Sequence, residues 1–466
     1  MTQFILNNTE IKISLPKGMT ILDFVRYHQH LTGTKIGCRE GDCGACTMLV
    51  GTLQGDIVKY HSVTSCLMPI GNAHGKHIVT IEGVNLEKLN VVQQSFSDHA
   101  ATQCGFCTPG FIVSLTGFCL EDKNPSCENA IDAVNGNICR CTGYKSIEKA
   151  AASISNQLQE RKQTNPIEFA VNNNIVPEYF LTIVSRLKNI EPITVSGYEN
   201  KKVGGGTDLY VQQHDTITHE KIDFLLHNPY LSGIMQNGNT CSFGGATTVS
   251  EMAESSVFNQ HFKNLKKYIK LVSSTPIRNM ATVAGNFTNA SPIGDLTIMF
   301  LALDAQLTLN DGKNDRKVPL RAFYKGYKKL EKKDNEIIER ISFELPSADD
   351  IFNFEKVCKR THLDIASVNS AIFLKMNGKT IERAGISAGG VGPIPMYLPK
   401  SSEFLTGKTV SEKLVLELIE IAQTEISPIS DARGTEQYKR LLLSQLIKAH
   451  FIESFRHVDT NKLLKN

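Results

Sequence analysis

Residues 37–47 read GCREGDCGACT, and this short stretch decides the fold of the first part of the chain. It holds Cys38, Cys43 and Cys46, with four and then two residues between them. Cys66 follows after 19 further residues. This is the plant-type spacing of the four ligands of a [2Fe–2S] cluster. The sequence therefore predicts a first iron–sulfur site at these four cysteines.

The glycines of the same stretch support this prediction. Three thiolates that reach one small inorganic core from one loop need a tightly curled backbone, which Gly37, Gly41 and Gly44 permit. A curled loop also directs backbone N–H groups at the sulfurs and offsets their negative charge. The alternative is a zinc site with four cysteines, but such sites usually pair two short Cys-x2-4-Cys elements. Here three ligands share one loop and the fourth stands alone, which favours iron–sulfur.

A second set of cysteines follows the first. QCGFCTPGF supplies Cys104 and Cys107, two residues apart, and ICRCTGYKSI supplies Cys139 and Cys141, one residue apart, with 31 residues between the pairs. Thr108–Pro109 is typical of a helix start, where unsatisfied N–H groups would face the thiolates. Four-cysteine zinc sites also use paired cysteines, so the spacing of this set leaves both zinc and iron–sulfur open.

Ten of the 12 cysteines lie in the first 141 residues, which favours metal binding over a disulfide framework in a chain of this length. Cys119 lies in an apolar run and is interpreted as a buried small hydrophobe. Cys127 has no evident partner. Cys241 and Cys358 lie in strand-like segments and are interpreted as structural.

Composition limits the classes of partner and the compartment. With 466 residues and 41% hydrophobic residues the chain predicts several globular domains, and a net charge of +3 argues against nucleic acid or a membrane surface as partner. No apolar run reaches the roughly 18 residues that span a bilayer. The first 18 residues alternate like a strand and do not resemble a secretory signal, so a cytoplasmic location is expected.

Hydrophobic periodicity divides the chain. Residues 1–83 predict short strands, with a hairpin at Asn7–Asn8 and a helix capped by Thr20, whereas residues 85–157 predict a small helical bundle. Residues 203–213 predict a turn and a strand, and residues 280–296 a strand, a turn and a helix. Further strands are predicted at 354–360 and 368–379, followed by two long helices. The predicted domains are 1–83, 84–160, a linker at 161–176, 177–346 and 347–466.

Two glycine-containing segments are candidates for binding a nucleotide. VGGGTDL, from residue 203, is a turn whose N–H groups could hold a phosphate, but it is neither the Rossmann fingerprint nor a P-loop, and an ordinary turn is the simpler interpretation. The second segment, residues 285–295, collects polar and turn-forming residues at a density that is typical of a backbone close to a ligand.

With both cysteine sets in view, GCREGDCGACT, QCGFCTPG and CRCTGY resemble the iron–sulfur region of the molybdenum hydroxylases, the xanthine dehydrogenase and aldehyde oxidase family. KVGGGTDL and STPIRNMATVAGNFTNASPIGDL resemble its two flavin-binding segments, and FYKGYKKL and KRTHLDIASVNSAI match later landmarks. The resemblance implies a multidomain α+β chain. Its parts would be a plant-type ferredoxin β-grasp domain, a four-helix [2Fe–2S] domain, a vanillyl-alcohol-oxidase/MurB-like FAD-binding domain and a C-terminal α+β flavoprotein domain.

The resemblance also implies site residues. It makes Cys104, Cys107, Cys139 and Cys141 ligands of a second [2Fe–2S] cluster, and it places Gln103 at an interface with the pterin. Arg39 and Arg140, each beside a ligand, are either tuning charges or solvated arginines. The implied FAD-binding residues are Gly204, Gly205, Gly206, Thr207, Asp208, Leu209, Thr282, Gly285, Asn286, Asn289, Ser291, Asp295, Ile338 and Lys356.

The function implied by the resemblance is electron transfer in a xanthine dehydrogenase. Electrons would leave a molybdopterin site on a separate large subunit, pass two [2Fe–2S] clusters and FAD, and reach NAD⁺, in an (αβ)₂ heterotetramer that oxidises hypoxanthine and xanthine to urate. No catalytic residue for the substrate chemistry is expected in this chain. One alternative is the equivalent subunit of an aldehyde or N-heterocycle hydroxylase, because the substrate site would lie on the separate subunit. Another is a zinc-stabilised assembly protein that binds a nucleotide. His362 and Leu363 replace charged residues of the family near the acceptor face of the flavin, which leaves open whether the acceptor is NAD⁺, oxygen or another molecule.

Overall fold

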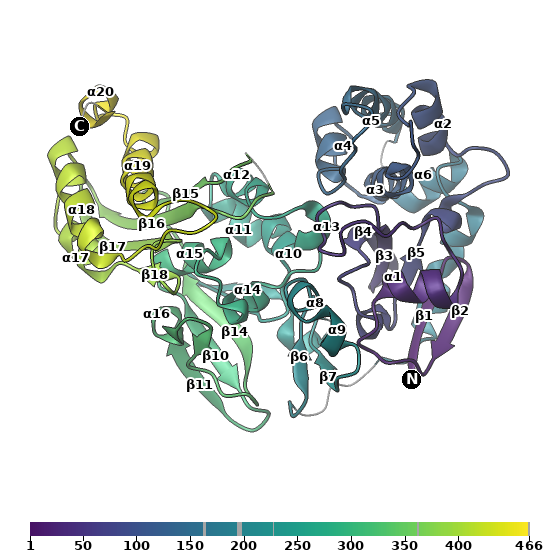
Figure 1. The fold of residues 1–466 in the computed structure, drawn as a ribbon, viewed down its shortest axis with the longest axis horizontal. Helices are drawn as coiled ribbons and strands as arrows, with labels where there is room; N and C mark the ends of the chain where they lie inside the picture. The colour runs from purple at the N-terminus through teal and green to yellow at the C-terminus, as the bar shows by residue number, and fades with distance from the viewer. Residues whose placement is uncertain (162–164, 193–197, 227, 361–362, 465–466) are drawn as a thin grey trace. The chain divides into compact units, whose positions relative to one another are not determined.

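The computed structural model describes residues 1–161, 165–192, 198–226, 228–360 and 363–464 (Figure 1). The chain divides into two compact units. Unit 1 comprises Met1–Ser196, Asn200–Leu226 and Ser274–Ala281, and unit 2 comprises Gly197–Glu199, His227–Ser273 and Thr282–Asn466. The predicted multidomain α+β class is confirmed, and each unit is described separately.

The first part of unit 1 is a five-stranded sheet with the order β2-β1-β5-β3-β4. Its strands are β1 (Thr2–Leu6), β2 (Thr9–Ile13), β3 (Thr47–Gln54), β4 (Ile57–Thr64) and β5 (His77–Val79). The predicted hairpin is present, because β1 and β2 pair antiparallel with Leu6 opposite Thr9 and Asn7 takes φ of 52°. Thr20 accepts a hydrogen bond from the N–H of Asp23, and so caps α1 (Ile21–Asp23) as predicted.

The predicted helical bundle follows the sheet. It contains α2 (Val91–Asp98), α3 (Thr108–Leu120), α4 (Cys127–Ala133) and α5 (Lys145–Leu158). Helix α3 contacts α2 and α4 as well as β3 and β4 (Figure 1), and 11 of its 13 residues are buried. It is therefore the helix that joins the bundle to the sheet. Cys119 lies in α3 and is fully buried, as expected.

The stretch predicted as a linker contains structure in its described part. Helix α6 (Pro166–Asn172) begins after Asn165, whose side chain accepts a hydrogen bond from the N–H of Ile167. Ile167 and Ala170 join the hydrophobic cluster of the bundle. The helix has only seven residues, which is too short to show a clear helical period, and residues 162–164 lie outside the described part.

The rest of unit 1 corrects one sequence prediction. Residues 209–212 form a helix, α8, where a strand was predicted, because the N–H of Tyr210 bonds to the carbonyl of Gly206 and the buried Tyr210 ring anchors the turn. The remaining elements are α7 (Ile183–Lys188), β6 (Lys201–Val203), α8 (Leu209–Gln212), α9 (His214–Ile217), β7 (Ile222–Phe224) and α13 (Thr275–Arg278). Strands β6 and β7 pair in parallel.

Unit 2 contains a five-stranded sheet with the order β11-β10-β14-β9-β8. Its strands are β8 (Ile234–Asn237), β9 (Thr240–Gly244), β10 (Gln306–Asn310), β11 (Asp315–Pro319) and β14 (Ile337–Glu344). Its helices are α10 (Val249–Glu254), α11 (Ser256–His261), α12 (Leu265–Lys270), α14 (Val283–Asn289), α15 (Asp295–Ala302) and α16 (Leu320–Phe323). The strand predicted near residue 283 is wrong, because Thr282 caps α14 by accepting from the N–H of Gly285.

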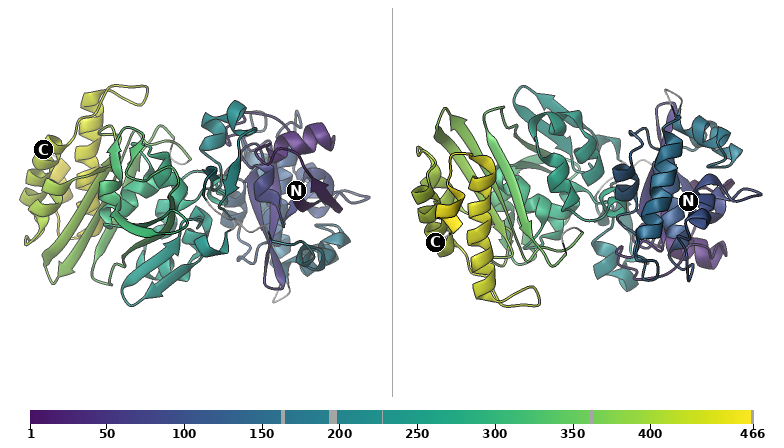
Figure 2. Two further views of the ribbon diagram at one scale, coloured as in Figure 1. Left: turned by 90° about the horizontal axis from the view of Figure 1, so that it is seen from below. Right: turned by 90° about the horizontal axis from the view of Figure 1, so that it is seen from above.

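The second sheet of unit 2 has the order β15-β16-β17-β18. Its elements are β15 (Ile351–Val357), β16 (Val368–Asn377), β17 (Thr380–Gly389) and β18 (Met396–Tyr397), with α17 (Pro399–Leu405), α18 (Glu412–Glu425), α19 (Glu436–Ser454) and α20 (Thr460–Leu464). Helix α19 lies along β15 and β16 (Figure 2), and Val368 and Ile372 pack into the cluster beneath it. Both long helices and both strands match the predictions. In the part of the chain that is described, no helix combines the length and apolarity needed to cross a bilayer.

Candidate functional site

Strand pairing explains how Cys46 and Cys66 meet. Cys46 precedes β3 directly and Cys66 follows the end of β4 by two residues. Strands β3 and β4 form a hairpin in which Thr47 lies opposite Thr64. The 19 residues between the two cysteines therefore form this hairpin, which brings Cys66 back beside Cys46. The N–H and hydroxyl of Ser65 both donate to the carbonyl of Cys46 and close this end.

The four thiols of the first set form two hydrogen-bonded pairs. The bond from Cys43 lowers the pKa of Cys38 to about 4, and the bond from Cys66 lowers the pKa of Cys46. The pKa values of Cys43 and Cys66 are raised, because each shares its proton with the neighbouring sulfur. Within each pair the hydrogen bond thus lowers the pKa of one thiol and raises that of the other, and metal binding would release the remaining protons.

The loop that carries this set is as tightly curled as its glycines predicted. A Cβ on Gly37 would lie 2.6 Å from the Cys43 sulfur, and one on Gly44 would lie 2.3 Å from the carbonyl oxygen of Gly136. Gly44 also takes φ of +67°, a conformation that other residues rarely adopt. The N–H groups of Cys38 and Glu40 point at the sulfurs of Cys43 and Cys38, at 3.4 and 3.3 Å. The loop therefore supplies the predicted donors to the sulfurs.

The second set has the same paired arrangement. Cys104 is hydrogen-bonded to Cys141 and Cys107 to Cys139. Bonds from the Phe106 N–H and from Cys141 lower the pKa of Cys104, whereas burial and the bond to Cys139 raise the pKa of Cys107 to about 12. Cys107 immediately precedes α3, with proline in the first turn, as predicted.

The eight thiols form four hydrogen-bonded pairs. This arrangement fits two [2Fe–2S] clusters in which each iron takes two thiolates. We propose the eight cysteines as ligands on this pairing, with Cys38/Cys43 and Cys46/Cys66 in the first cluster.

Direct contacts join the two cysteine loops. The N–H of Ile138 donates to the carbonyl of Cys43 at 3.0 Å, and Ile138 is bonded covalently to Cys139. The side chain of Asn137 donates to the carbonyl of Gly44 at 3.0 Å and is itself buried. Gly110 of α3 lies so close that an added Cβ would be 2.4 Å from the same carbonyl oxygen. Both loops therefore form one packed structure.

Arg39 does not act as an isolated charge beside its cysteine. Its guanidinium donates to both carboxylate oxygens of Asp23, at 2.7 and 3.2 Å, and lies 3.4 Å from Nε2 of His214. Burial acts to raise the pKa of Asp23, but the bonds from Arg39 and Thr20 outweigh it and lower that pKa. The Asp23 carboxylate therefore compensates the positive charge of Arg39, the charge that was considered for tuning the first cluster. Gln103 and Arg140 are exposed.

Gly204–Leu209 belongs to unit 1. An added Cβ on Gly205 would lie 1.9 Å from the carbonyl oxygen of Met280, and Gly206 takes φ of +84°. Among the described residues, no acceptor bonds to the backbone N–H of Gly205, Gly206 or Thr207. Free N–H groups on a left-handed turn can hold a phosphate. The loop fits the predicted pyrophosphate site, which stays a proposal.

The other predicted flavin residues belong to unit 2, and several have structural partners. Thr282 caps α14, and Asn286 accepts from the N–H and hydroxyl of Thr297 at 3.1 and 2.9 Å. Lys328 donates to the carbonyl and side chain of Asn289. Gly285 lies in α14 and Ser291 lies just after it. Ile338 is a buried residue of β14, in the five-stranded sheet of unit 2.

The pairing of β15 with β16 places two side chains, those of Lys356 and Asn369, against Asp295. Lys356 of β15 lies directly opposite Asn369 of β16, so both side chains project from the same face of the sheet. Lys356 donates to Asp295 at 2.7 Å and Asn369 donates to its other oxygen at 2.6 Å. Burial raises the pKa of Asp295, and the bonds from Lys356 and Asn369 oppose that rise. The carboxylate is held inside unit 2.

Removing the lysine tests this arrangement. We expect Lys356→Met to lower the free energy of unfolding by about 3 kcal/mol, because it leaves a buried carboxylate without its counter-ion. Chemical unfolding followed by circular dichroism measures the loss. Lys375→Met is the matched control, since Lys375 pairs with Glu344 at a half-exposed position of the same sheet. An equal loss in both variants would contradict the buried-pair interpretation.

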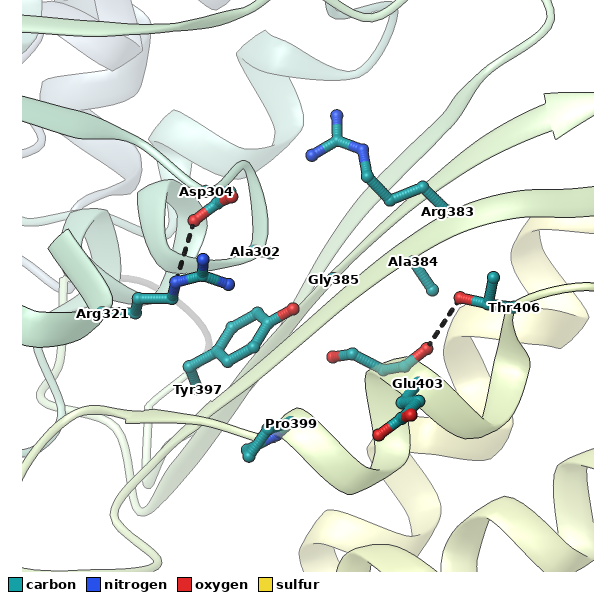
Figure 3. Close-up of a pocket in the computed structure, with 11 residues that line it drawn as sticks. Ala302, Asp304, Arg321, Arg383, Ala384, Gly385, Tyr397, Pro399, Glu403 and Thr406 are labelled. Carbon is teal, nitrogen blue, oxygen red and sulfur yellow. Dashed lines mark hydrogen bonds and ion pairs between the residues drawn. The ribbon is translucent and has the colours of Figure 1, made fainter. Parts of the chain in front are cut away.

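A separate pocket in unit 2 contains none of the predicted flavin residues. It has a volume of about 290 Å³, and its walls include Arg321, Arg383 and Tyr397 (Figure 3). Both arginines already pair with acids: Arg321 lies 3.5 Å from Asp304, and Arg383 lies 2.8 Å from Glu344. Its charges are therefore largely balanced within the protein.

Sequence analysis missed Asn137, Gly110 and Asn369 as site residues. Each contributes through a contact with a segment far along the chain. Asn369 could have been found from the predicted pairing of the two strands, which sets it opposite Lys356. No pattern in the sequence signals the contact of Asn137 or Gly110 with Gly44.

Four family models match the chain in succession. Residues 4–70 match the 2Fe-2S iron-sulfur cluster binding domain, 80–152 the [2Fe-2S] binding domain, 181–347 the FAD binding domain in molybdopterin dehydrogenase, and 354–454 the CO dehydrogenase flavoprotein C-terminal domain. The first two matches contain the first and second cysteine sets. The predicted flavin residues fall within the third match, apart from Lys356 in the fourth.

Related proteins agree with these matches. Xanthine dehydrogenase 1 of Arabidopsis thaliana is 28% identical over 96% of this chain and 39% of its own length. Aldehyde oxidase 2 of Macaca fascicularis is 26% identical over 97% of this chain and 38% of its own length. The chain therefore spans about two fifths of the length of the curated relatives it matches.

Solved structures share the fold of about half of the chain. A carbon monoxide dehydrogenase chain from Hydrogenophaga pseudoflava has a TM-score of 0.50 and 23% identity, covering 53% of this chain and 87% of that chain. A chain of quinoline 2-oxidoreductase from Pseudomonas putida 86 has a TM-score of 0.50 and 21% identity, covering 55% of this chain and 88% of that chain. The ordered domain matches and the two cysteine sets show that the chain belongs to the molybdenum hydroxylase family, of which it carries the iron–sulfur and FAD-binding domains.

Proposed function

We propose that this chain is the electron-transfer subunit of a xanthine dehydrogenase. It would take electrons from a molybdopterin-binding large subunit, pass them through two [2Fe–2S] clusters to FAD, and deliver them to NAD⁺ while hypoxanthine and xanthine are oxidised to urate. Clusters carry electrons singly, and a flavin can collect two and release them as a hydride. The domain boundaries and the (αβ)₂ assembly predicted from the sequence belong to this proposal. The free thiols of the ligand sets fit a reducing compartment such as the cytoplasm.

The observation that carries the proposal is the unequal exposure of the two cysteine sets. Cys46 and Cys66 are 2% and 1% exposed. Cys104 and Cys141 are exposed, and so are the neighbouring apolar side chains of Phe106, Ile138 and Tyr144. Exposed large apolar side chains around a functional group are typical of a docking surface. The second set is therefore the place where an electron-donating partner can approach.

The contact between the two cysteine loops supports electron transfer from that exposed surface inward to the first set. Cys139 is joined through Ile138 and its N–H to the carbonyl of Cys43, which lies in the first set. The path consists of covalent bonds and one hydrogen bond of 3.0 Å, inside a packed interface. The residues between the sets would thus hold the two clusters in a fixed relation to one another.

The proposal is tested with the purified chain and its partner. The chain should be brown and contain about four iron and four sulfide, two clusters' worth, together with FAD. After co-purification with a molybdopterin-binding subunit, the complex should reduce NAD⁺ when given hypoxanthine. Colourless protein that carries zinc would overturn the cluster assignment. Absence of NAD⁺ reduction with every purine would overturn the xanthine dehydrogenase assignment.

The second candidate is the same type of subunit in another molybdenum hydroxylase. The departure at Leu363 from the charged residues of the family bears on the electron acceptor of this chain, NAD⁺ or another, and His362 lies outside the described residues. The similarity to an aldehyde oxidase is nearly as high as that to xanthine dehydrogenases. Turnover of aldehydes or N-heterocycles by a complex that is inactive with purines would support this candidate.

A further inference from the structure

The turn after the last two cysteines holds a side chain directly against one ligand sulfur. The hydroxyl oxygen of Thr142 lies 3.2 Å from Sγ of Cys139, and the backbone N–H of Thr142 points at the same sulfur at 3.5 Å. Cys139 is 6% exposed, and Thr142 is partly buried. Cys141, the other cysteine of this turn, is exposed.

The direction of the hydroxyl bond follows from its other partner. The N–H of Tyr144 donates to the hydroxyl oxygen of Thr142 at 3.3 Å, which occupies an acceptor position and leaves the hydroxyl proton free to point at Cys139. A sulfur bound to iron has lost its proton and can only accept. With Cys139 bound to iron, the contact would therefore be an O–H···S bond donated by Thr142.

The backbone accepts strain to keep this arrangement. Tyr144 takes φ of 70°, a left-handed conformation that is unusual for a large side chain, and Gly143 before it takes φ of 64°. The two left-handed residues return the Tyr144 ring to the cysteines, where its hydroxyl accepts from the N–H of Cys139 at 3.1 Å. Strained residues of this kind persist where the surrounding structure holds them for function.

We propose that Thr142 is a positioning residue that raises the reduction potential of the second cluster by donating a hydrogen bond from its hydroxyl to the Cys139 sulfur. The inference rests on the proposed ligand role of Cys139. Reduction adds one negative charge to the cluster and its thiolates, so a donor at a ligand sulfur stabilises the reduced form more than the oxidised form. A higher potential makes the second cluster a better acceptor for electrons that enter at the exposed surface.

The test is a redox titration of the full chain followed by electron paramagnetic resonance. We expect Thr142→Val to shift the equilibrium between oxidised and reduced second cluster about tenfold toward the oxidised form, which is about 59 mV for a one-electron couple. Thr142→Ser keeps a hydroxyl and should retain most of the original potential. Thr102→Val is the matched control, because its hydroxyl bonds to that of Thr108 at 2.8 Å in the other cysteine loop of this set. The redox transition of the second cluster is identified by titrating a Cys43→Ser protein, in which the first cluster is expected to be absent.

The outcomes separate this inference from the proposed function. Two clusters with an unshifted second potential in Thr142→Val would overturn the role of Thr142 and leave the electron-transfer function standing. The same shift in Thr142→Ser or Thr102→Val would overturn it too, since the hydroxyl contact would not be the cause. If Thr142→Val fails to load its second cluster, Thr142→Ala is titrated in its place, and an unshifted potential there has the same meaning. Absence of both clusters from the unmodified protein would overturn the proposed function itself.

Discussion

A Cys43→Ser protein is expected to lose its first cluster and to contain half the iron and sulfide of the unmodified chain. The Cys43 thiol is the proton-sharing partner of Cys38, and its own loop is closed around it by Gly37. A serine hydroxyl stays protonated where the thiol would ionise, so one iron would lose one of its two protein ligands. FAD is expected to stay bound, because none of the proposed flavin residues contributes to this pair. Iron, sulfide and flavin analysis of the purified variant measures all three quantities.

Cys127→Ser is the control for this experiment. Cys127 is an exposed first residue of α4 in the same cysteine-rich part of the chain and belongs to neither ligand set. Its substitution should leave iron, sulfide and flavin unchanged. Two intact clusters in Cys43→Ser would show that the ligand assignment is wrong.

Gly110→Ala is expected to destabilise the iron–sulfur part of the chain by about 4 kcal/mol. The new Cβ would lie 2.4 Å from the carbonyl oxygen of Gly44, and a backbone atom cannot move aside as a side chain can. The α3 helix and the first loop must separate, which costs 1–3 kcal/mol for overpacking and about as much again for the buried Asn137 amide that loses its acceptors. Chemical unfolding followed by cluster absorbance measures the change. Electron exchange between the clusters should also slow, because the bond from Ile138 to Cys43 lies in the same contact.

Gly117→Ala is the matched substitution in the same helix. Its Cβ would lie 2.7 Å from Cδ2 of Leu49, the end of a flexible side chain that can rotate away. Alanine is also favoured over glycine within a helix by roughly 0.5–1 kcal/mol. We therefore expect little change or a small gain in stability. Equal destabilisation by both substitutions would show that α3 tolerates no added volume anywhere, and that the contact with Gly44 has no special role.

The elements predicted well are those with a strong local pattern. The hairpin at Asn7–Asn8, the cap at Thr20 and both long C-terminal helices depend on residues close together in sequence. The errors at residues 209–212 and 283–289 have a common cause. Both segments follow glycine-containing or polar turns and are short, so hydrophobic period could not separate a helix from a strand, and the bonds made by Gly206 and Thr282 decided the outcome.

The sequence by itself predicted both ligand sets, the first from the local spacing of its cysteines and the second from the resemblance of its motifs to a known family. It also determined the order of the four domains. Only the tertiary structure decided which thiols pair and which set is exposed. It also decided that Gly110 and Asn137 pack against Gly44 in the loop of the first cysteine set. It likewise placed Lys356 and Asn369 on Asp295. These features depend on strand register and on close approach between distant segments, which arise from packing of the whole chain and leave no periodic trace in the order of residues.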